Sequence, residues 1–310
     1  DSPAVGDFVA HHAERVTFFE YLQWHAHRQL QACQETARSA GMPIGAYLDI
    51  ADGVDRDSAE AWWSQDYLVG GWSIGAPPDN WNLKGQSWGA PPPNVTRMRE
   101  TAYAAIRECL DANMRYAGAI RIDHILGFMR MFWVPEAANA ADGAYIRYPL
   151  RELLSILALE SQRHRCLVIG EDLGTVPDGL HEALQEAAIL SYRLLYFEHE
   201  ADGSFRKPGN WPQQALVAPS THDLSTLPAY WHGADLTLRS KLDLYPSPEV
   251  ADAERQRRAV DKRQLVAALA AEGLPAPADG DAPVEAIYRF LARTSSCLLM
   301  VQPEDLLGIV

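Results

Sequence analysis

Three acidic side chains each stand at or just past the end of a short apolar run, where packing does not explain a carboxylate. Asp123 ends Ala-Gly-Ala-Ile-Arg-Ile, Glu171 ends Cys-Leu-Val-Ile-Gly, and Asp223 follows Ser-Thr-His. They are 48 and 52 residues apart, so only the fold can bring them together. Such a set suits glycoside chemistry. One carboxylate attacks the anomeric carbon, a protonated second one acts on the leaving oxygen, and a third holds the sugar as charge develops.

The neighbours of two of these residues indicate different roles. Arg121 lies two residues before Asp123 on the same face of the expected strand, and its charge favours the ionised form that a nucleophile needs. Glu171 follows a wholly apolar run, where burial favours the protonated form of a general acid. A single Asp at a strand end is more often a helix N-cap, and Asp123 with Arg121 can be a structural ion pair. Three such sites together favour catalysis.

Aromatic and imidazole side chains near these acids suit sugar binding. His124 and His222 flank Asp123 and Asp223, and we expect both to contact sugar hydroxyls. The segment 69–93 is rich in Gly, Pro and Trp and predicts a long irregular loop. Its tryptophans can stack on the apolar faces of sugars, or they can seal the loop against the rest of the protein.

The composition narrows the class of ligand. The 27 basic and 41 acidic residues give a net charge of −14, which disfavours nucleic acid and anionic membranes and favours neutral or cationic ligands. No apolar run approaches the length of about 18 residues that a membrane span needs. Four cysteines without short spacing predict buried free thiols and no zinc site. With no signal peptide at the start, a reducing cytoplasm is expected.

Strands and helices are expected to alternate, which predicts βαβ units and a parallel sheet. The expected helices are most of the first forty residues, segments beginning near 103 and 150, then 179–188 and most of 224–293. The expected strands are 44–50, 117–123, 166–171, 192–197, 215–220 and 296–301. Acidic residues at their carboxyl ends favour an α/β barrel, whose active site lies at that end. An open doubly wound sheet usually carries a GxGxxG loop, which is not found after these strands.

Six strands are fewer than the eight of a closed barrel. The predicted fold class is therefore α/β, a (β/α)8 TIM-type barrel with insertions, incomplete at its N-terminus or with two strands overlooked. We expect one catalytic barrel portion over 1–310, with a lid-like loop at 69–93 and a helical insertion at about 234–275.

Five motifs in register carry a resemblance to a known family. They are Gly75-Ala-Pro-Pro-Asp79, Gly85-Gln86-Ser-Trp88-Gly89, Arg121-Ile-Asp123-His124, Gly170-Glu171-Asp172-Leu-Gly174-Thr175-Val-Pro177 and Thr221-His222-Asp223. Over essentially all 310 residues the chain resembles the amylomaltases, or 4-α-glucanotransferases, of glycoside hydrolase family 77. The likeness is greatest to their bacterial maltose-pathway branch. Family proteins are longer, with further strands upstream of the matching region.

The resemblance implies roles for individual residues. It implies that Asp123 is the nucleophile, Glu171 the general acid/base and Asp223 the stabiliser of the transition state. Arg121 and His222 match residues that hold the nucleophile and the sugar in the donor subsite.

Four further residues are implicated by the same resemblance. Asp49 matches a carboxylate of the donor subsite at an earlier strand end. Asp79, Gln86 and Trp88 match a segment that covers the acceptor side. The family often has an aromatic residue where Asn80 stands here, so acceptor contacts are expected to differ.

The predicted function is a retaining 4-α-glucanotransferase that moves α-1,4-glucan segments between maltooligosaccharides without metal or cofactor. An α-amylase-like hydrolase is the nearest alternative, since both share the same intermediate. An enolase-type enzyme could bind Mg²⁺ through Asp49, Asp123 and Glu171, but it needs a strand-end base, and no Lys lies there. An inactive glucan-binding fragment is a third alternative. Maltooligosaccharides or other α-1,4-glucans are the expected partners, with no nucleic acid and no membrane.

Overall fold

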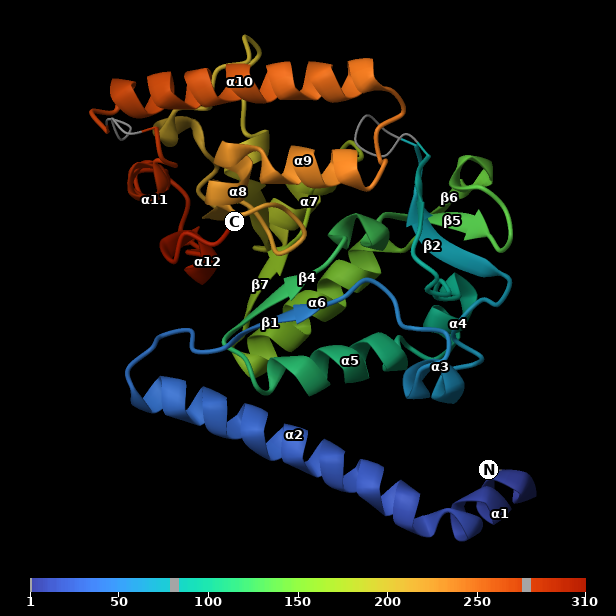
Figure 1. Ribbon diagram of the computed structural model, residues 1–310. Helices are drawn as coiled ribbons and strands as arrows, with labels where there is room; N and C mark the ends of the chain where they lie inside the picture. Colours follow the sequence, from blue (N-terminus) through green and yellow to red (C-terminus); the bar gives the residue numbers. More distant parts are fainter. Residues whose placement is uncertain (1, 79–83, 275–279) are drawn as a thin grey trace. The chain divides into compact units, whose positions relative to one another are not determined.

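The chain folds into two compact units. The computed structural model describes residues 2–78, 84–274 and 280–310 (Figure 1). The first unit holds residues 1–171 and 176–187, and the second unit holds 172–175 and 188–310. Each unit has its own strands and buried side chains.

Three parallel strands form the centre of the first unit. They are β1 (Tyr47–Ile50), β4 (Ala119–Ile122) and β7 (Leu167–Gly170), with β4 in the middle. Every residue of β4 is buried, as expected for a strand covered on both faces. Helix α5 (Ala104–Met114) contacts β1, β4 and α6 (Leu150–His164), whose buried leucines follow a helical period.

A second, antiparallel sheet also belongs to the first unit. Its order is β3 (Gln86–Ser87), β2 (Trp72–Ala76), β5 (Arg130–Pro135) and β6 (Ala144–Arg147). The prediction of an irregular loop over 69–93 is therefore wrong for β2 and β3. The sequence conceals this pairing because the partner of β2 is β5, which lies far along the chain.

Close backbone approach requires a glycine in β2. A Cβ atom on Gly75 would lie 2.0 Å from the carbonyl oxygen of Gln86 in β3. Gly75 therefore lets β3 pair with β2 beside the packed side chain of Ile74, which is fully buried. This pairing positions Gln86 and Trp88, two of the predicted binding residues.

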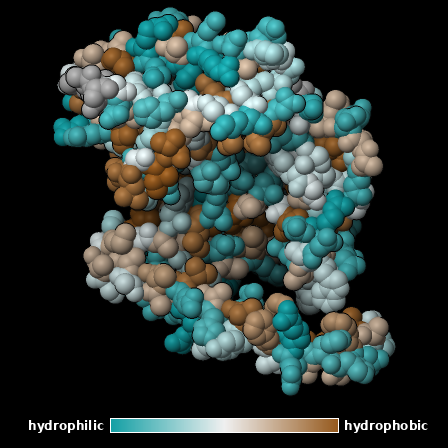
Figure 2. Space-filling view, viewed as in Figure 1, coloured by the Kyte–Doolittle hydropathy of each residue, from teal (hydrophilic) through white to brown (hydrophobic). Residues whose placement is uncertain are grey.

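The N-terminal part is helical, as predicted, with α1 (Pro3–His11) and α2 (Ala13–Ser39). Phe18, Tyr21 and Leu22 have the i, i+3, i+4 spacing that is typical of a core-facing helix surface, but they are 45%, 54% and 43% exposed. Hydrophobic and hydrophilic residues are mixed at the bottom of Figure 2, where Figure 1 shows α2. The buried residue of α2 is Gln34, which accepts a 2.7 Å hydrogen bond from the N–H of Ala46 just before β1.

The second unit also contains three parallel strands. They are β8 (Leu190–Leu194), β9 (Ala215–Ala218) and β10 (Leu298–Leu299), with β9 in the middle. All six predicted strands are thus present, although each is shorter than expected. The strand expected at 192–197 begins at Leu190 and stops at Leu194, where a 3₁₀ turn, η3 (Leu195–Phe197), begins.

Helices surround the strands of the second unit, and they fill much of 224–293 as predicted. They are α8 (Leu227–His232), α9 (Ala234–Lys241), α10 (Pro248–Ala271), α11 (Val284–Leu291) and α12 (Pro303–Leu306). Their apolar side chains pack into one core around Leu195, Val217, Leu269 and Phe290. The remaining short elements are α3 (Ala59–Trp63), α4 (Val95–Glu100), α7 (Leu180–Glu186), η1 (Ile125–Phe128), η2 (Ala140–Asp142) and η4 (Pro208–Asn210).

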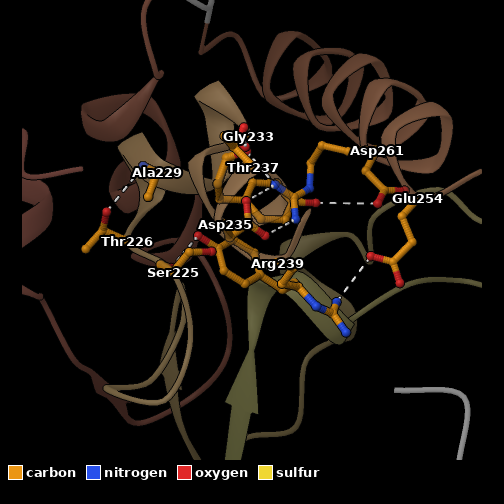
Figure 3. Close-up of polar contacts among 12 residues, drawn as sticks. Ser225, Thr226, Ala229, Gly233, Asp235, Thr237, Arg239, Glu254 and Asp261 are labelled. Carbon is orange, nitrogen blue, oxygen red and sulfur yellow. Dashed lines mark hydrogen bonds and ion pairs between the residues drawn. The ribbon is translucent and has the colours of Figure 1, made fainter. Parts of the chain in front are cut away.

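A charged cluster joins α8, α9 and α10 within the second unit (Figure 3). Arg258 of α10 forms an ion pair of 2.7 Å with Asp235 of α9, and its guanidinium lies 3.6 Å from the ring centre of Tyr230 in α8. Tyr230 stacks on Tyr196 with ring centres 4.1 Å apart. One arginine thereby connects three helices through ionic and cation–π contacts.

All four cysteines are free, as predicted, but only Cys166 is buried. Cys33 and Cys297 are exposed and Cys109 is half-buried, so the expectation of four buried thiols is wrong. The burial of a thiol depends on which face of its helix or strand it lies on. Apolar neighbours in the sequence do not determine that face. Separately, none of the helices in the described ranges is long and apolar enough to cross a membrane.

Candidate active site

An arginine joins two strand-end carboxylates in the first unit. Arg121 of β4 stands opposite Asp49 of β1 in the strand register. Its Nη1 lies 2.9 Å from both carboxylate oxygens of Asp49, and its Nη2 lies 2.6 Å from Oδ1 of Asp123. Three residues that the sequence predicted for the site are therefore in direct contact.

The electrostatics of this group depend on the buried arginine. Arg121 is only 5% exposed, and this burial opposes its charge. The hydrogen bond that Arg121 donates to Asp49 and the negative charges of Asp123, Asp49 and Glu171 outweigh burial and raise the pKa of Arg121. Arg121 is thus a permanent cation whose charge is shared among nearby carboxylates.

Glu171 lies at the end of β7 and accepts hydrogen bonds from residues that follow β4. The N–H of His124 donates a 2.9 Å hydrogen bond to Oε2 of Glu171, and the N–H of Ile125 donates to its carbonyl oxygen at 3.1 Å. Glu171 is 8% exposed, as its apolar run predicted. His124 adopts a left-handed backbone conformation with φ of 46°, which is uncommon outside glycine and often occurs at functional sites.

Two of the predicted lid residues lie beside His124. The ring of Trp88 meets the His124 ring edge-to-face with centres 5.2 Å apart. The indole N–H of Trp88 donates to Oε1 of Gln86 at 3.3 Å. Burial lowers the pKa of His124, against an opposing effect of the Asp123 charge, so its imidazole is neutral at pH 7. Asp79, the third predicted lid residue, lies outside the described residues.

Asp223 and His222 follow β9 in the second unit. Both side chains are exposed, and Nε2 of His222 lies 3.4 Å from Oδ2 of Asp223. The Asp223 N–H donates to the hydroxyl oxygen of Thr221 at 3.1 Å, which fixes the turn after the strand. The convergence of Asp223 with the acids of the first unit stays a prediction.

Asp52 is a site residue that the sequence reasoning missed. It follows β1, three residues beyond Asp49, and its Oδ2 atom is shielded from solvent with no hydrogen-bond partner among the described residues. Burial, then the charges of Asp123 and Glu171, raise the pKa of Asp52 to about 8. The sequence did contain a signal for Asp52, namely a second carboxylate just past a strand that already has Asp49 near its end.

Asp172, the residue that follows Glu171, has a structural role. Asp172 accepts a 3.0 Å hydrogen bond from the N–H of Tyr192 and pairs with Arg193, so it stabilises the second unit.

Within residues 2–78, 84–274 and 280–310, no three His, Cys, Asp or Glu side chains are grouped to hold a metal ion.

Parallel strands with acidic residues at their carboxyl ends define this chain as an α/β-barrel protein with an acidic strand-end site. The family model described as 4-alpha-glucanotransferase, of glycoside hydrolase family 77, matches residues 1–309. The chain belongs to this family.

Individual relatives agree with this assignment. The chain is 41% identical to a 4-alpha-glucanotransferase of Haemophilus influenzae and 38% identical to one of Mycobacterium tuberculosis. These matches cover 96% and 99% of the chain but only 44% and 43% of the two relatives. The chain thus spans less than half the length of either relative.

Solved structures confirm the fold. The crystal structure of amylomaltase from Corynebacterium glutamicum matches with a TM-score of 0.87 and 33% identity, over 93% of this chain and 42% of that one. An amylomaltase from Streptococcus agalactiae, solved with acarbose, matches with a TM-score of 0.76 and 20% identity, over 99% of this chain and 57% of that one. The described residues hold six of the eight parallel strands of a (β/α)8 TIM-type barrel.

Proposed function

We propose that the protein containing this chain is a 4-α-glucanotransferase that moves α-1,4-glucan segments between maltooligosaccharides. The observation that carries the proposal is the pairing of Asp123 with the buried cation Arg121 beside a shielded Glu171. An ionised carboxylate next to a carboxyl group that can hold a proton is what a retaining glycosidase mechanism requires. Family membership supports the same activity.

The proposed reaction has two displacements. Asp123 attacks the anomeric carbon while Glu171 gives its proton to the departing glucan oxygen, which leaves a glycosyl-enzyme intermediate. Glu171 then takes the proton from the 4-hydroxyl of a second glucan, and that oxygen displaces Asp123 with net retention. Asp223 stabilises the charge that develops in both steps. Retention predicts a separation of about 5–5.5 Å between the carboxyl groups of Asp123 and Glu171.

Arg121 and His124 prepare the two carboxyl groups for these steps. Arg121 orients Asp123 through an ion pair, and Asp49 holds the other side of the guanidinium. The His124 N–H donates to one carboxylate oxygen of Glu171 and so orients this carboxyl group. Asp49 and His222 are proposed donor-subsite contacts to sugar hydroxyls.

Transfer in place of hydrolysis requires that water be excluded from the intermediate. We assign this task to the lid-like segment 69–93, whose Gln86 and Trp88 adjoin His124 and whose Asp79 completes the predicted acceptor contacts. The flat ring of Trp88 is 38% exposed and offers a stacking surface for a glucose unit. We further propose that 234–275 is a helical insertion in the catalytic portion 1–310.

Incubation with maltotriose tests the function directly. A transferase redistributes chain lengths without changing the number of reducing ends, so each longer product is accompanied by a shorter one. An α-amylase-like hydrolase forms only shorter chains and adds one reducing end for each bond that it cleaves. The variant Asp123→Asn should lose transfer, and EDTA should leave transfer unchanged. Loss of activity in EDTA that Mg²⁺ restores would instead support the enolase-type alternative.

The cellular setting follows from charge and thiols. Four free cysteines suit a reducing compartment, and we propose the cytoplasm. An acidic protein with a charge of −14 is suited to a neutral glucan and not to nucleic acid or an anionic membrane surface.

A further inference from the structure

A turn after β1 places one more carboxyl group inside the acidic site. The N–H of Asp123 donates to the carbonyl oxygen of Ile50 at 3.0 Å, so the turn that carries Asp52 starts beside the nucleophile. Gly53 follows with φ of +81°, and a Cβ atom there would lie 2.7 Å from the Cβ of Ala90. The turn that follows Asp52 is therefore packed closely against Ala90, and Oδ2 of Asp52 itself is shielded from solvent.

The charges around Asp52 do not balance if every acid is ionised. One guanidinium, Arg121, serves Asp49, Asp123 and Glu171. Asp52 adds a fourth carboxyl group, and the influences on it are, largest first, its burial and the charges of Asp123 and Glu171. Four ionised carboxylates with the Arg121 cation would leave a net charge of −3 on these five groups, of which the Asp49 and Asp123 side chains are 41% and 35% exposed.

The other groups facing Asp52 do not neutralise it. Tyr148 has its pKa raised chiefly by burial and to a smaller extent by the charge of Asp52, and its hydroxyl donates to the carbonyl oxygen of Pro93 at 2.6 Å. Ala90 and Ile74 provide apolar surface next to Gly53. A buried, unpartnered Oδ2 among such neighbours favours the neutral carboxyl form.

We propose that Asp52 is a positioning residue that remains protonated in the working enzyme, and that release of its proton to solvent at alkaline pH suppresses glucan transfer through Asp123 and Glu171. This inference rests on the proposed function, because it concerns the same two carboxyl groups. An ionised Asp52 repels the carboxylate of Asp123 and the charge that Glu171 acquires as it donates its proton. Asp52 itself touches no reacting atom.

The experiment compares pH profiles of kcat/KM for the wild type, Asp52→Asn and a control. Asn has the shape of a protonated Asp and cannot ionise. With the pKa of Asp52 near 8, only about a tenth of the wild type keeps this proton at pH 9. The ratio of Asp52→Asn to wild-type kcat/KM should therefore rise about tenfold between pH 7 and pH 9. Because Glu171 titrates in both proteins, its own contribution largely cancels in the ratio.

Asp57→Asn is the matched control, since Asp57 is an exposed acid five residues further along the same connection between β1 and α3. Its ratio to the wild type should stay flat over this range. A flat ratio for Asp52→Asn as well would overturn the proposal. If Asp52→Asn does not fold, Asp52→Ala takes its place, with the same rise expected.

A second readout separates this inference from the proposed function. The unfolding free energy of the wild type should fall with rising pH more steeply than that of Asp52→Asn, and equal slopes would also overturn the inference. If the wild type transfers no glucan under any condition, the proposed function fails. The comparison of slopes then decides the protonation of Asp52 alone.

Discussion

At the scale of single residues, the candidate site depends on how one cation is shared. Arg121 contacts Asp49 through Nη1 and Asp123 through Nη2, so each carboxylate restrains the geometry of the other. A guanidinium can do this because its donors form a rigid planar fork, which a lysine ammonium lacks. Asp123, the proposed nucleophile, is therefore oriented by two neighbouring strands and not by its own turn alone.

The variant Arg121→Lys tests this sharing. A lysine keeps the charge but cannot hold both carboxylates in the same geometry, and a hydrogen bond to a charged group is worth about 1.5–3 kcal/mol. We expect kcat/KM for transfer to fall by roughly ten- to a hundredfold. Arg97→Lys, at an exposed pair with Asp66, is the control and should change kcat/KM less than about twofold. Unchanged transfer in Arg121→Lys would contradict the role assigned to the fork.

A second residue-scale prediction concerns stability and pH. Asp52 has a pKa of about 8 in the folded protein, chiefly through burial, against 3.8 as the reference value. The folded state keeps this proton while the unfolded chain releases it, so the unfolding free energy falls as pH rises from about 4 to 8. The maximal slope is about 1.4 kcal/mol per pH unit. Urea unfolding at several pH values should show this slope reduced in Asp52→Asn.

At the scale of elements, the short antiparallel sheet of the first unit positions Gln86 and Trp88, which do not lie on the parallel strands. β2 pairs with β5 and with β3, and β3 carries Gln86, two residues before Trp88. The turn at His124 then brings the imidazole against the Trp88 ring. Two elements outside the parallel strands thus supply the candidate acceptor surface.

The helices of the second unit offer an element-scale prediction. Asp235 pairs with Arg258, whose side chain is 14% exposed, so Asp235→Asn leaves a largely buried guanidinium without its counter-ion. We expect a loss of unfolding free energy of up to about 3 kcal/mol, measured by denaturant unfolding. Asp252→Asn, which breaks an exposed pair with Arg255 on the same helix, should cost less than about 1 kcal/mol. Equal effects of the two variants would show that the cluster of Figure 3 does not join the helices.

At the scale of the whole molecule, the three proposed catalytic acids are divided between the two units. Asp123 and Glu171 belong to the first unit, and Asp223 follows a strand of the second. Each unit has a hydrophobic core of its own. The net charge of −14 is distributed over both units, whereas the proposed substrate carries no charge.

Substrate neutrality gives a whole-molecule prediction. A neutral glucan feels no long-range attraction or repulsion from a charge of −14, so salt screening should not alter its encounter rate. We expect kcat/KM for maltooligosaccharides to change less than about twofold between low salt and about 0.3 M NaCl. A steep dependence on ionic strength would indicate a charged natural substrate.

Sequence alone determined the six parallel strands, the acids at their ends and the family. Such strands are near-continuous apolar runs, so the local sequence is enough to recognise them. A carboxylate at the end of such a run is equally recognisable, because it needs contact with water or a ligand. The pairing of Arg121 with Asp123 followed from their two-residue spacing on one face of a strand.

Only the tertiary structure decided features that depend on what packs against a residue. β2 was hidden because its partner, β5, lies far along the chain, and the apolar face of α2 is exposed although its spacing is typical of a core-facing helix surface. The exposure of Cys33 likewise depends on its place on α2. Asp52 became a candidate only because the fold shields its Oδ2 atom without a hydrogen-bond partner among the described residues. Burial sets the charge state of such a group, and burial is a property of the assembled fold.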